Sequence, residues 1–283
     1  MNLVDTHCHL NHPPLNHDTD GVLARAAAMG VMKVVVPAYD APCWAELARL
    51  AVRPGVVVGL GLHPWLAHDL PTQVAALEGA TAPPAAFPGS TAAEAARAAA
   101  LDSLLEHLAG RIGRQRPAAI GEIGLDTKIS SSGLVEQMPL LERQLALAVD
   151  FDLPVILHCR GAFEEMLTAV GRHRGRLRGV VHAYSRGPEL AARFVDVGLH
   201  IALGGAATHP RAQQVRRAAR TIPLDRLVLE TDAPAIGLEN VTPEQTEPRH
   251  VHEVAGAVAL LRGQTVESLA AATSANAASL FNL

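Results

Sequence analysis

The sequence is poor in cysteine, lysine and aromatic residues, and it contains no apolar run long enough to span a membrane. Its three cysteines, Cys8, Cys43 and Cys159, are an odd number and lie far apart. This usage favours a reducing cytosol over a disulfide scaffold. The chain enters a predicted strand at once, without a charged and then apolar leader. We therefore expect a cytoplasmic protein with no membrane contact.

The charge and aromatic content exclude a broad nucleic-acid-binding surface. The net charge is -4 at pH 7, so any contact with nucleic acid must be local to a cleft. Aromatic residues make up 3% of the chain, too few for a base-stacking platform. A non-catalytic nucleic-acid-binding protein is therefore a weak alternative to an enzyme.

Short β-rich runs alternate with helical stretches along the whole chain of 283 residues. Eight strand–helix units predict one domain over residues 1–283 with the fold of a (β/α)8 TIM barrel. A doubly wound open sheet is the alternative, but no Gly-x-Gly-x-x-Gly follows the first strand. The predicted strands are Asn2–Asp5, Met32–Pro37, Val56–Leu62, Ala118–Ile123, Pro154–His158, Gly179–His182, His200–Leu203 and Leu227–Thr231.

One segment, residues 79–100, interrupts this alternation. Gly79–Gly89 is rich in alanine and proline, and Ser90–Ala100 is mostly alanine. We expect an exposed insertion in the third strand–helix unit, with a short helix from Thr91 and no role in chemistry.

Polar residues of metal-ligand type stand at the ends of the predicted strands. Burying so many polar groups without partners is costly, and strand ends of a barrel converge on one face. The pattern therefore predicts a metal site at the C-terminal face of the strands. The residues are His7, His9, His63, Glu122, His158, His182 and Asp232.

Six motifs around these residues make the chain resemble the TatD family of metal-dependent hydrolases. They are Asp-Thr-His-Cys-His-Leu (5–10), Gly-Leu-His-Pro (61–64), Gly-Glu-Ile-Gly-Leu-Asp (121–126), Leu-Pro-Val-Ile-Leu-His-Cys-Arg (153–160), Val-His-Ala-Tyr-Ser (181–185) and Leu-Glu-Thr-Asp-Ala-Pro (229–234). The resemblance implies a barrel with two divalent metal ions that acts as a DNase on phosphodiester bonds. It also implies that His7, His9 and Asp232 bind one metal, that His158 and His182 bind the other, and that Glu122 bridges them.

The residue types are consistent with this chemistry. Imidazole and carboxylate ligands suit Zn²⁺, Mn²⁺ and Mg²⁺, so the identity of the metal stays open. Glu122 and Asp232 are the expected catalytic residues, because a carboxylate ligand can also accept a proton from the attacking water. Arg160 and His63 are expected to contact a substrate phosphate.

Four nearby positions receive secondary interpretations. Two interpretations stay open for Glu230, an orienting partner of a ligand or part of a core ion pair, and two for Asp126, which either orients a ligand or caps a loop. Cys8 and Cys159 flank ligand histidines, but the two-residue period of a strand directs them towards the outer helices as buried small residues.

The expected substrate is DNA with single-stranded or frayed ends, and the resemblance alone implies cleavage from the 3′ end. No obligate protein partner is indicated. Thr127, Arg186 and Thr246-Glu247-Pro248 depart from the family pattern at the rim of the site. Hydrolysis of an amide, a lactone or a D-aminoacyl ester therefore remains an alternative, since the barrel and its ligands do not dictate the substrate.

Overall fold

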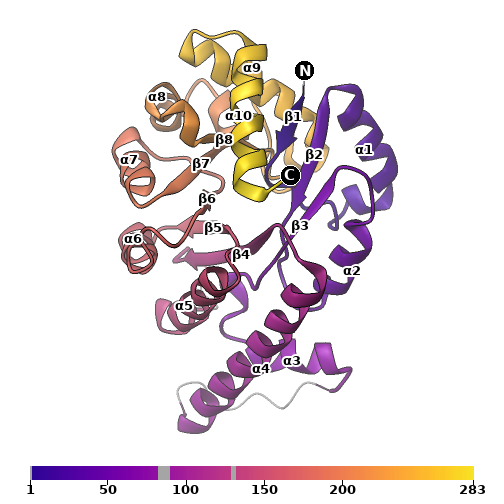
Figure 1. The fold of residues 1–283 in the computed structure, drawn as a ribbon, viewed down its shortest axis with the longest axis vertical. Coiled ribbons are helices and arrows are strands. Elements are labelled where there is room, and N and C mark those ends of the chain that lie inside the picture. The colour runs from indigo at the N-terminus through magenta and orange to yellow at the C-terminus, as the bar shows by residue number, and fades with distance from the viewer. Residues whose placement is uncertain (1, 82–89, 129–131) are drawn as a thin grey trace.

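Eight parallel strands form one sheet in sequence order, and helices surround it (Figure 1). The computed structural model describes residues 2–81, 90–128 and 132–283. The arrangement is a (β/α)8 barrel, which confirms the prediction. The strands are β1 (Leu3–Asp5), β2 (Val31–Val36), β3 (Val56–Leu60), β4 (Ala119–Asp126), β5 (Val155–Arg160), β6 (Gly179–Val181), β7 (Leu199–Leu203) and β8 (Leu227–Leu229).

The helices cover the outside of this sheet and bury their apolar faces against it (Figure 1). They are α1 (Thr19–Ala28), α2 (Cys43–Leu50), α3 (Leu70–Glu78), α4 (Thr91–Gln115), α5 (Leu134–Asp150), α6 (Phe163–Gly171), α7 (Pro188–Asp196), α8 (Gln213–Thr221), α9 (Val251–Arg262) and α10 (Val266–Phe281).

Helix α4 corrects the expectation for residues 79–100. It begins at Thr91 but runs for 25 residues, so the alanine-rich segment is the start of a long helix and not a short separate one. Ser90 caps it by accepting a hydrogen bond from the Ala93 amide at 3.2 Å, and alanine has the highest helix propensity. Its second half buries leucines against the barrel, which holds the exposed first half in line. Residues 82–89 lie outside the described part of the chain.

Hydrogen bonds between the first and last strands close the barrel. The Asp232 amide donates to the His7 carbonyl oxygen at 2.9 Å. The buried carboxylate of Asp5 accepts from the Thr231 amide and hydroxyl at 2.9 and 2.6 Å. These contacts fix the two strand ends that carry His7 and Asp232.

The barrel interior is filled by apolar side chains, and α10 covers its N-terminal mouth. Leu280 and Phe281 of α10 pack against the inward-facing residues of the strands. The Asn276 side chain donates to the Leu227 carbonyl oxygen at 2.8 Å, which holds α10 across the start of β8 (Figure 1). Helix α10 therefore covers part of the N-terminal mouth, and the C-terminal mouth is available for a site.

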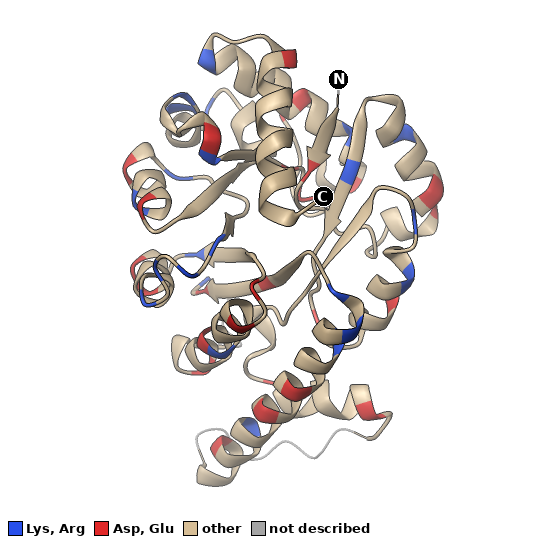
Figure 2. Ribbon diagram, viewed as in Figure 1, with Lys and Arg blue, Asp and Glu red and all other residues tan. Residues whose placement is uncertain are grey.

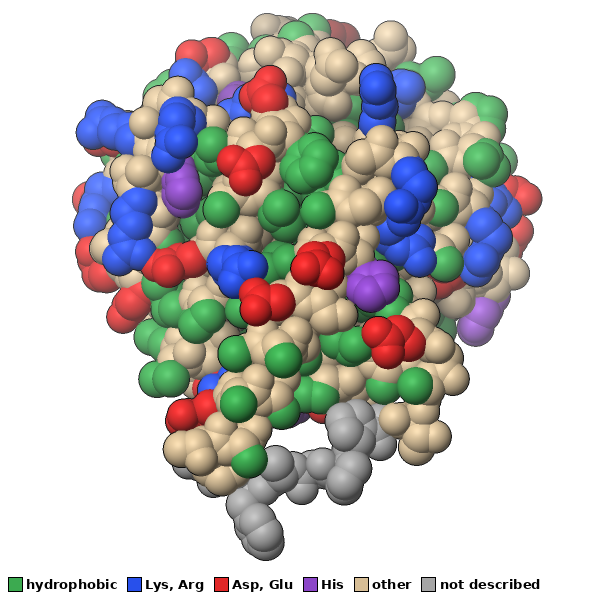
Figure 3. Space-filling view, turned by 60° about the horizontal axis from the view of Figure 1, so that its bottom comes forward, with side chains coloured by type: hydrophobic (Ala, Val, Ile, Leu, Met, Phe, Trp, Pro, Cys, Tyr) green, Lys and Arg blue, Asp and Glu red, His purple; other side chains and the backbone are tan. Residues whose placement is uncertain are grey.

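Charged residues of both signs are intermingled on the outer helices (Figure 2). The face shown in Figure 3 likewise carries basic, acidic and apolar side chains side by side. This distribution fits the expectation that no broad basic face exists. Among the described helices, none is both long and apolar enough to cross a membrane.

Candidate metal centre and active site

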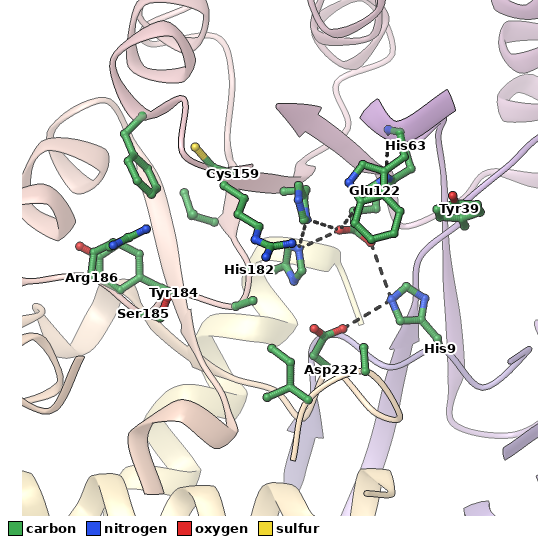
Figure 4. A pocket seen from close by; sticks show the side chains of 18 of the residues that line it. His9, Tyr39, His63, Glu122, Cys159, His182, Tyr184, Ser185, Arg186 and Asp232 are labelled. Carbon is green, nitrogen blue, oxygen red and sulfur yellow. Dashed lines mark hydrogen bonds and ion pairs between the residues drawn. The ribbon is translucent and has the colours of Figure 1, made fainter. Parts of the chain in front are cut away.

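The structure brings together all six residues expected to bind metal. They lie at the carboxyl ends of the strands, where four of them, His9, Glu122, His182 and Asp232, are seen pointing towards one another in Figure 4. His7 and His9 follow β1, Glu122 lies within β4, His158 lies within β5, His182 follows β6 and Asp232 follows β8. Their roles as ligands stay predictions, while their convergence is a property of the fold.

Glu122 lies at the centre of this cluster, and its two carboxylate oxygens face different histidines. Oε2 is 3.4 Å from His7 Nε2 and 3.8 Å from His9 Nε2. Oε1 is 2.8 Å from His182 Nε2 and 3.0 Å from His158 Nδ1. A carboxylate placed between two groups of imidazoles is suited to bridging two metal ions.

His7, His9 and Asp232 form the first group. The two Nε2 atoms are 3.3 Å apart, and they lie 3.5 and 3.4 Å from Asp232 Oδ1. Asp232 has a φ of 55°, in the left-handed region that aspartate tolerates better than most residues. This turn in the backbone follows β8 directly and allows the carboxylate to face the histidines of β1.

Asp126 orients His158 in the second group. β4 extends to Asp126, beyond the expected Ile123, and Asp126 Oδ2 accepts from His158 Nε2 at 3.0 Å and from Trp65 Nε1 at 2.9 Å. With Nε2–H donated in this way, His158 presents Nδ1 to Glu122, an arrangement typical of metal-binding histidines. Asp126 Oδ1 also accepts from the Lys128 amide at 2.7 Å. Asp126 therefore both holds His158 and caps the loop after β4, while the role of His158 as a ligand stays a prediction.

A close approach of β4 and β5 sets the distance between Glu122 and His158. Gly124 pairs with His158 and has a φ of +154°. A Cβ atom at Gly124 would lie 1.9 Å from the His158 carbonyl oxygen. Glycine at this position therefore permits the two strands to bring their side chains into contact.

His63 lies beside the cluster as a hydrogen-bond donor. Its Nδ1 accepts from the Trp65 amide at 3.2 Å, so in the neutral ring Nε2 carries the proton. Nε2 is 3.4 Å from Glu122 Oε1 and is buried at the mouth of the barrel. A protonated Nε2 does not bind metal, so the geometry favours the predicted contact with substrate over a ligand role.

Arg160 is the last residue of β5 and lines the same cavity. Its side chain is 56% exposed, and its Nη1 lies 3.8 Å from Asp126 Oδ2. This single long contact leaves most of the guanidinium available for a ligand. Contact with a phosphate stays a prediction.

Glu230 is fully buried behind the histidines. One of its carboxylate oxygens, Oε1, accepts from the Ala183 amide, while the other forms no hydrogen bond within the described chain. Ligand atoms of His7, His182 and Glu230 lie within 4.8 Å of one another. Burial and the charge of Asp232 raise the pKa of Glu230 well above its usual value. The contacts favour a partner of these histidines over a core ion pair.

Two buried glutamines of α5 that were not predicted hold the strand ends in place. Gln137 accepts from the Asp126 amide at 2.7 Å and donates to the Asp126 carbonyl oxygen at 2.8 Å. Gln144 makes the same pair of contacts with Leu62, at 2.8 and 3.1 Å. Their polar side chains within an otherwise apolar helix face are the signal from which they could have been found. Asp5, which holds Thr231, was also missed.

The cluster opens into a cavity of about 580 Å³. The chain has two tryptophans, two tyrosines and five phenylalanines, and four of these residues line the cavity: Tyr39, Trp65, Phe163 and Tyr184. His12 adds another ring, stacked on His9 with a centroid distance of 5.1 Å. The few aromatic residues are therefore concentrated at the site.

The two cysteines beside ligand histidines differ in position. Cys8 is fully buried in the core, as expected. For Cys159 the expectation is wrong, because it is only partly buried and lines the cavity. Cys159 is the penultimate residue of β5, where the strand becomes less buried as it reaches the cavity. Burial raises the pKa of the Cys159 thiol to about 12, so it is not a thiolate nucleophile at neutral pH.

The protonation states in the cluster suit a divalent cation. Burial opposes ionisation of Glu122, but the histidines His182, His63 and His7 outweigh it and hold its pKa well below the usual range. Burial, aided by nearby His182, lowers the pKa of His7 to about 4, so its ring is neutral at pH 7. Asp232 Oδ1 is buried and accepts no hydrogen bond within the described chain. An ionised carboxylate, a neutral imidazole at His7 and an unsatisfied buried acceptor together fit a bound metal.

Comparison with known proteins agrees with the motifs. Residues 4–282 match the family model described as TatD related DNase. The chain belongs to this family. One TatD-type relative, "Uncharacterized metal-dependent hydrolase YjjV" of Escherichia coli (strain K12), is 34% identical over 284 residues, covering 99% of this chain and 98% of the relative. Its solved structure, a TatD homolog, matches with a TM-score of 0.82 and 33% identity, covering 99% of this chain and 98% of that one.

A second TatD relative carries a more specific name. The "3'-5' ssDNA/RNA exonuclease TatD" of Erwinia amylovora is 37% identical over 171 residues. This match covers 58% of the chain and 66% of that protein. The resemblance to the TatD family that the motifs indicated is thereby confirmed.

In the metal-free TatD-family protein, His158 should make stability depend on pH. Burial lowers its pKa, but hydrogen bonds to Asp126 and Glu122 outweigh burial and raise it from 6.5 to about 9. Because the pKa of His158 is higher in the folded state than in the unfolded state, protonation of His158 stabilises the fold. This contribution to stability is complete below about pH 6.5 and is lost as pH rises through about 9. Metal must displace the same proton, so metal binding should tighten over that interval. Thermal unfolding in EDTA and titration with Mn²⁺ measure the two effects.

The Asp126→Asn variant provides the comparison for this pH dependence. Removing the carboxylate that accepts from His158 Nε2 lowers the pKa of His158, so both pH profiles should move to lower pH. Above pH 9 we expect metal affinity to fall by about 10–100-fold, since the ring loses its orienting partner. Profiles that coincide with those of the unchanged protein would contradict the pairing of His158 and Asp126.

Proposed function

We propose that this TatD-family protein is a divalent-metal-dependent hydrolase that cleaves phosphodiester bonds of DNA. The observation that carries the proposal is the position of Glu122, whose two oxygens face separate groups of histidines. The names of the relatives support it, because one is called a metal-dependent hydrolase and another a 3'-5' ssDNA/RNA exonuclease.

The residues would hold two divalent ions. His7, His9 and Asp232 would bind one and His158 and His182 the other, with Glu122 shared between them. This set of imidazoles and carboxylates suits Zn²⁺, Mn²⁺ or Mg²⁺. Ions bound there would lower the pKa of water towards about 7 and stabilise negative charge on a phosphate.

Asp232 is the proposed base. Burial opposes its ionisation, but contacts with His9, His7 and His182 outweigh burial and lower its pKa, so its carboxylate is charged at neutral pH. It lines the cavity and can accept a proton from the attacking water. Glu122, whose oxygens lie among the histidines of both groups, is proposed to fix the geometry of the centre.

Two donors are placed to bind the phosphate. His63 carries its proton on Nε2, which faces the cluster. Arg160 extends a half-exposed guanidinium from the end of β5, which can form two parallel hydrogen bonds to phosphate oxygens. Together they would orient the scissile bond towards Asp232.

The cavity favours the end of a single strand as substrate. Its volume of about 580 Å³ suits one small molecule or the terminal unit of a chain. A base within a duplex would have to leave its stack to enter, whereas a single-stranded or frayed end needs no such step. Tyr39 and Trp65 offer ring faces beside the cluster. We propose stepwise release of nucleotides, and the name of the Erwinia relative supports the 3′-to-5′ direction.

Metal depletion and reconstitution test the proposal. The protein is treated with EDTA, dialysed, and supplied with Mg²⁺, Mn²⁺ or Zn²⁺ in the presence of 5′-labelled single-stranded DNA. We expect a ladder of products that shortens progressively with at least one metal and no cleavage in EDTA. The same preparations are assayed with labelled RNA, a lactone, an amide and a D-aminoacyl ester.

The panel also separates the alternatives. Absence of DNA cleavage with every metal, together with rapid hydrolysis of an ester, lactone or amide, would replace the phosphodiesterase proposal with one of those activities. Binding of DNA without hydrolysis of any substrate would favour a non-catalytic protein.

A further inference from the structure

A second cavity, which we call the basic groove, adjoins the metal site. Its volume is about 510 Å³, and it shares Phe163 and Arg186 with the first cavity. Lys128, from the end of β4, and Arg217, from α8, complete its charged lining together with Glu189 of α7. The basic groove therefore runs outward from the metal cavity over elements that follow four successive strands, β4 to β7.

The cations of the basic groove lack acidic partners within the described chain. Lys128, Arg186 and Arg217 are exposed, and none of them forms an ion pair with a described carboxylate, although Glu189 lies in the same groove. Many other surface arginines are paired with acids. The paired arginines include Arg25, Arg53, Arg143, Arg172, Arg178 and Arg193. The basic groove thus gathers three cations that form no ion pair within the described chain, beside Glu189 as the one acidic residue of its lining.

Arg186 marks the passage between the two cavities. Its guanidinium carbon lies 5.1 Å from the centre of the Phe163 ring, a cation–π contact that holds the charge at this border. Figure 4 shows Arg186 and Tyr184 on one side of His182, Glu122 and Asp232, and it shows Tyr39 and His9 on the other side. The end of a linear substrate can therefore lie among the aromatic rings of the metal cavity while the rest of its chain extends past Arg186 into the basic groove.

We propose that the basic groove binds the sugar–phosphate backbone of the single strand on the side of the scissile bond that leads away from the metal cavity. This inference rests on the proposed phosphodiesterase function and identifies how the substrate is held beyond the reacting phosphate. Three cations would contact about three phosphates, since each neutralises about one. The contacts are made to the backbone, so binding is independent of base sequence.

The length of the substrate provides the test. A dinucleotide, thymidylyl-thymidine, reaches the metal cavity alone, whereas a decamer of thymidylate also reaches the basic groove. We expect Lys128→Ala/Arg217→Ala to lower kcat/KM for the decamer by about 10-fold or more, and to lower it far less for the dinucleotide. A plot of log kcat/KM for the decamer against the logarithm of the salt concentration has a negative slope. In the double variant this slope should be smaller in magnitude by about 1.4, or about 0.7 for each lost phosphate contact.

Lys33→Ala/Arg220→Ala is the matched control. It removes one lysine and one arginine, as the test variant does, but Lys33 lies at the N-terminal end of the barrel and Arg220 lies on α8 outside the basic groove. The control should retain the activity of the unchanged protein on both substrates. An equal loss on decamer and dinucleotide, or an equal loss in the control, would overturn the inference.

A binding measurement separates failure of the groove from failure of the proposed function. Fluorescence anisotropy of a labelled thymidylate decamer is recorded with the unchanged protein and both double variants. Weaker binding in Lys128→Ala/Arg217→Ala alone supports the basic groove even if no phosphodiester is cleaved. Identical binding by all three proteins refutes it even if DNA is a substrate.

Discussion

Replacing Asp232 with asparagine is expected to lower kcat on single-stranded DNA by about 10²–10⁴-fold at saturating metal, the range for loss of a positioned base. The carboxylate is buried among His7 and His9 and is ionised at neutral pH. Asparagine keeps the shape and one oxygen but accepts no proton at this pH. Steady-state cleavage of a labelled oligonucleotide over a range of metal concentrations gives kcat free of any change in metal affinity.

The fold should survive this substitution. Asp232 has a φ of 55°, and asparagine tolerates the left-handed region as well as aspartate does. Thermal unfolding of the metal-free variant should therefore stay close to that of the unchanged protein. Turnover near the original value at saturating metal would show that Asp232 is not the base.

Replacing Glu122 with glutamine is expected to remove metal as well as activity. Its two oxygens face histidines of both groups, so the loss of its charge weakens both halves of the proposed centre. We expect turnover to fall at least as far as in Asp232→Asn, with less than one equivalent of metal retained after dialysis. Elemental analysis of the dialysed protein measures the loss of metal, and an oligonucleotide cleavage assay measures the loss of turnover.

Glu230→Gln is the matched control, since it makes the same chemical change a few residues from Asp232. Burial and Asp232 raise the pKa of Glu230 well above its usual value, whereas the pKa of Glu122 is held well below it, so glutamine at Glu230 should change the charge of the site less than glutamine at Glu122 does. This variant should retain its metal. Full metal content in Glu122→Gln, or equal loss in both variants, would contradict the central position assigned to Glu122.

The sequence was sufficient to predict the barrel and the converging residues. Several short apolar strands carry a polar residue at or just past their end, as at His158 and His182, and parallel strands bring such ends together whatever their separation in the chain. From the sequence, orienting a ligand was one of two possible roles for Asp126, and capping a loop was the other. Its contact with His158 depends on the extension of β4 to Asp126, which the sequence did not predict. The length of a strand at the C-terminal face of the barrel depends on tertiary contacts, and the local sequence pattern does not encode these contacts.

Other features depend on packing and could not be predicted. Gln137 reaches the end of β4 at Asp126, and Gln144 reaches Leu62, 82 positions earlier in the chain, so their partners are known only once the helix is docked. The alanine-rich start of α4 has no apolar periodicity, and only the leucines that follow anchor it. The basic groove combines Lys128, which follows β4, with Arg217 of α8, and their proximity is known only once the barrel is formed.

Anomalous diffraction from crystals soaked in Mn²⁺ or Zn²⁺ tests the central claim most directly. The account predicts two peaks roughly 3.5–4 Å apart. One should lie within coordinating distance of His7, His9 and Asp232, the other within reach of His158 and His182, and Glu122 should contact both. Two or more of these six side chains lying beyond coordinating distance of any peak would contradict the account.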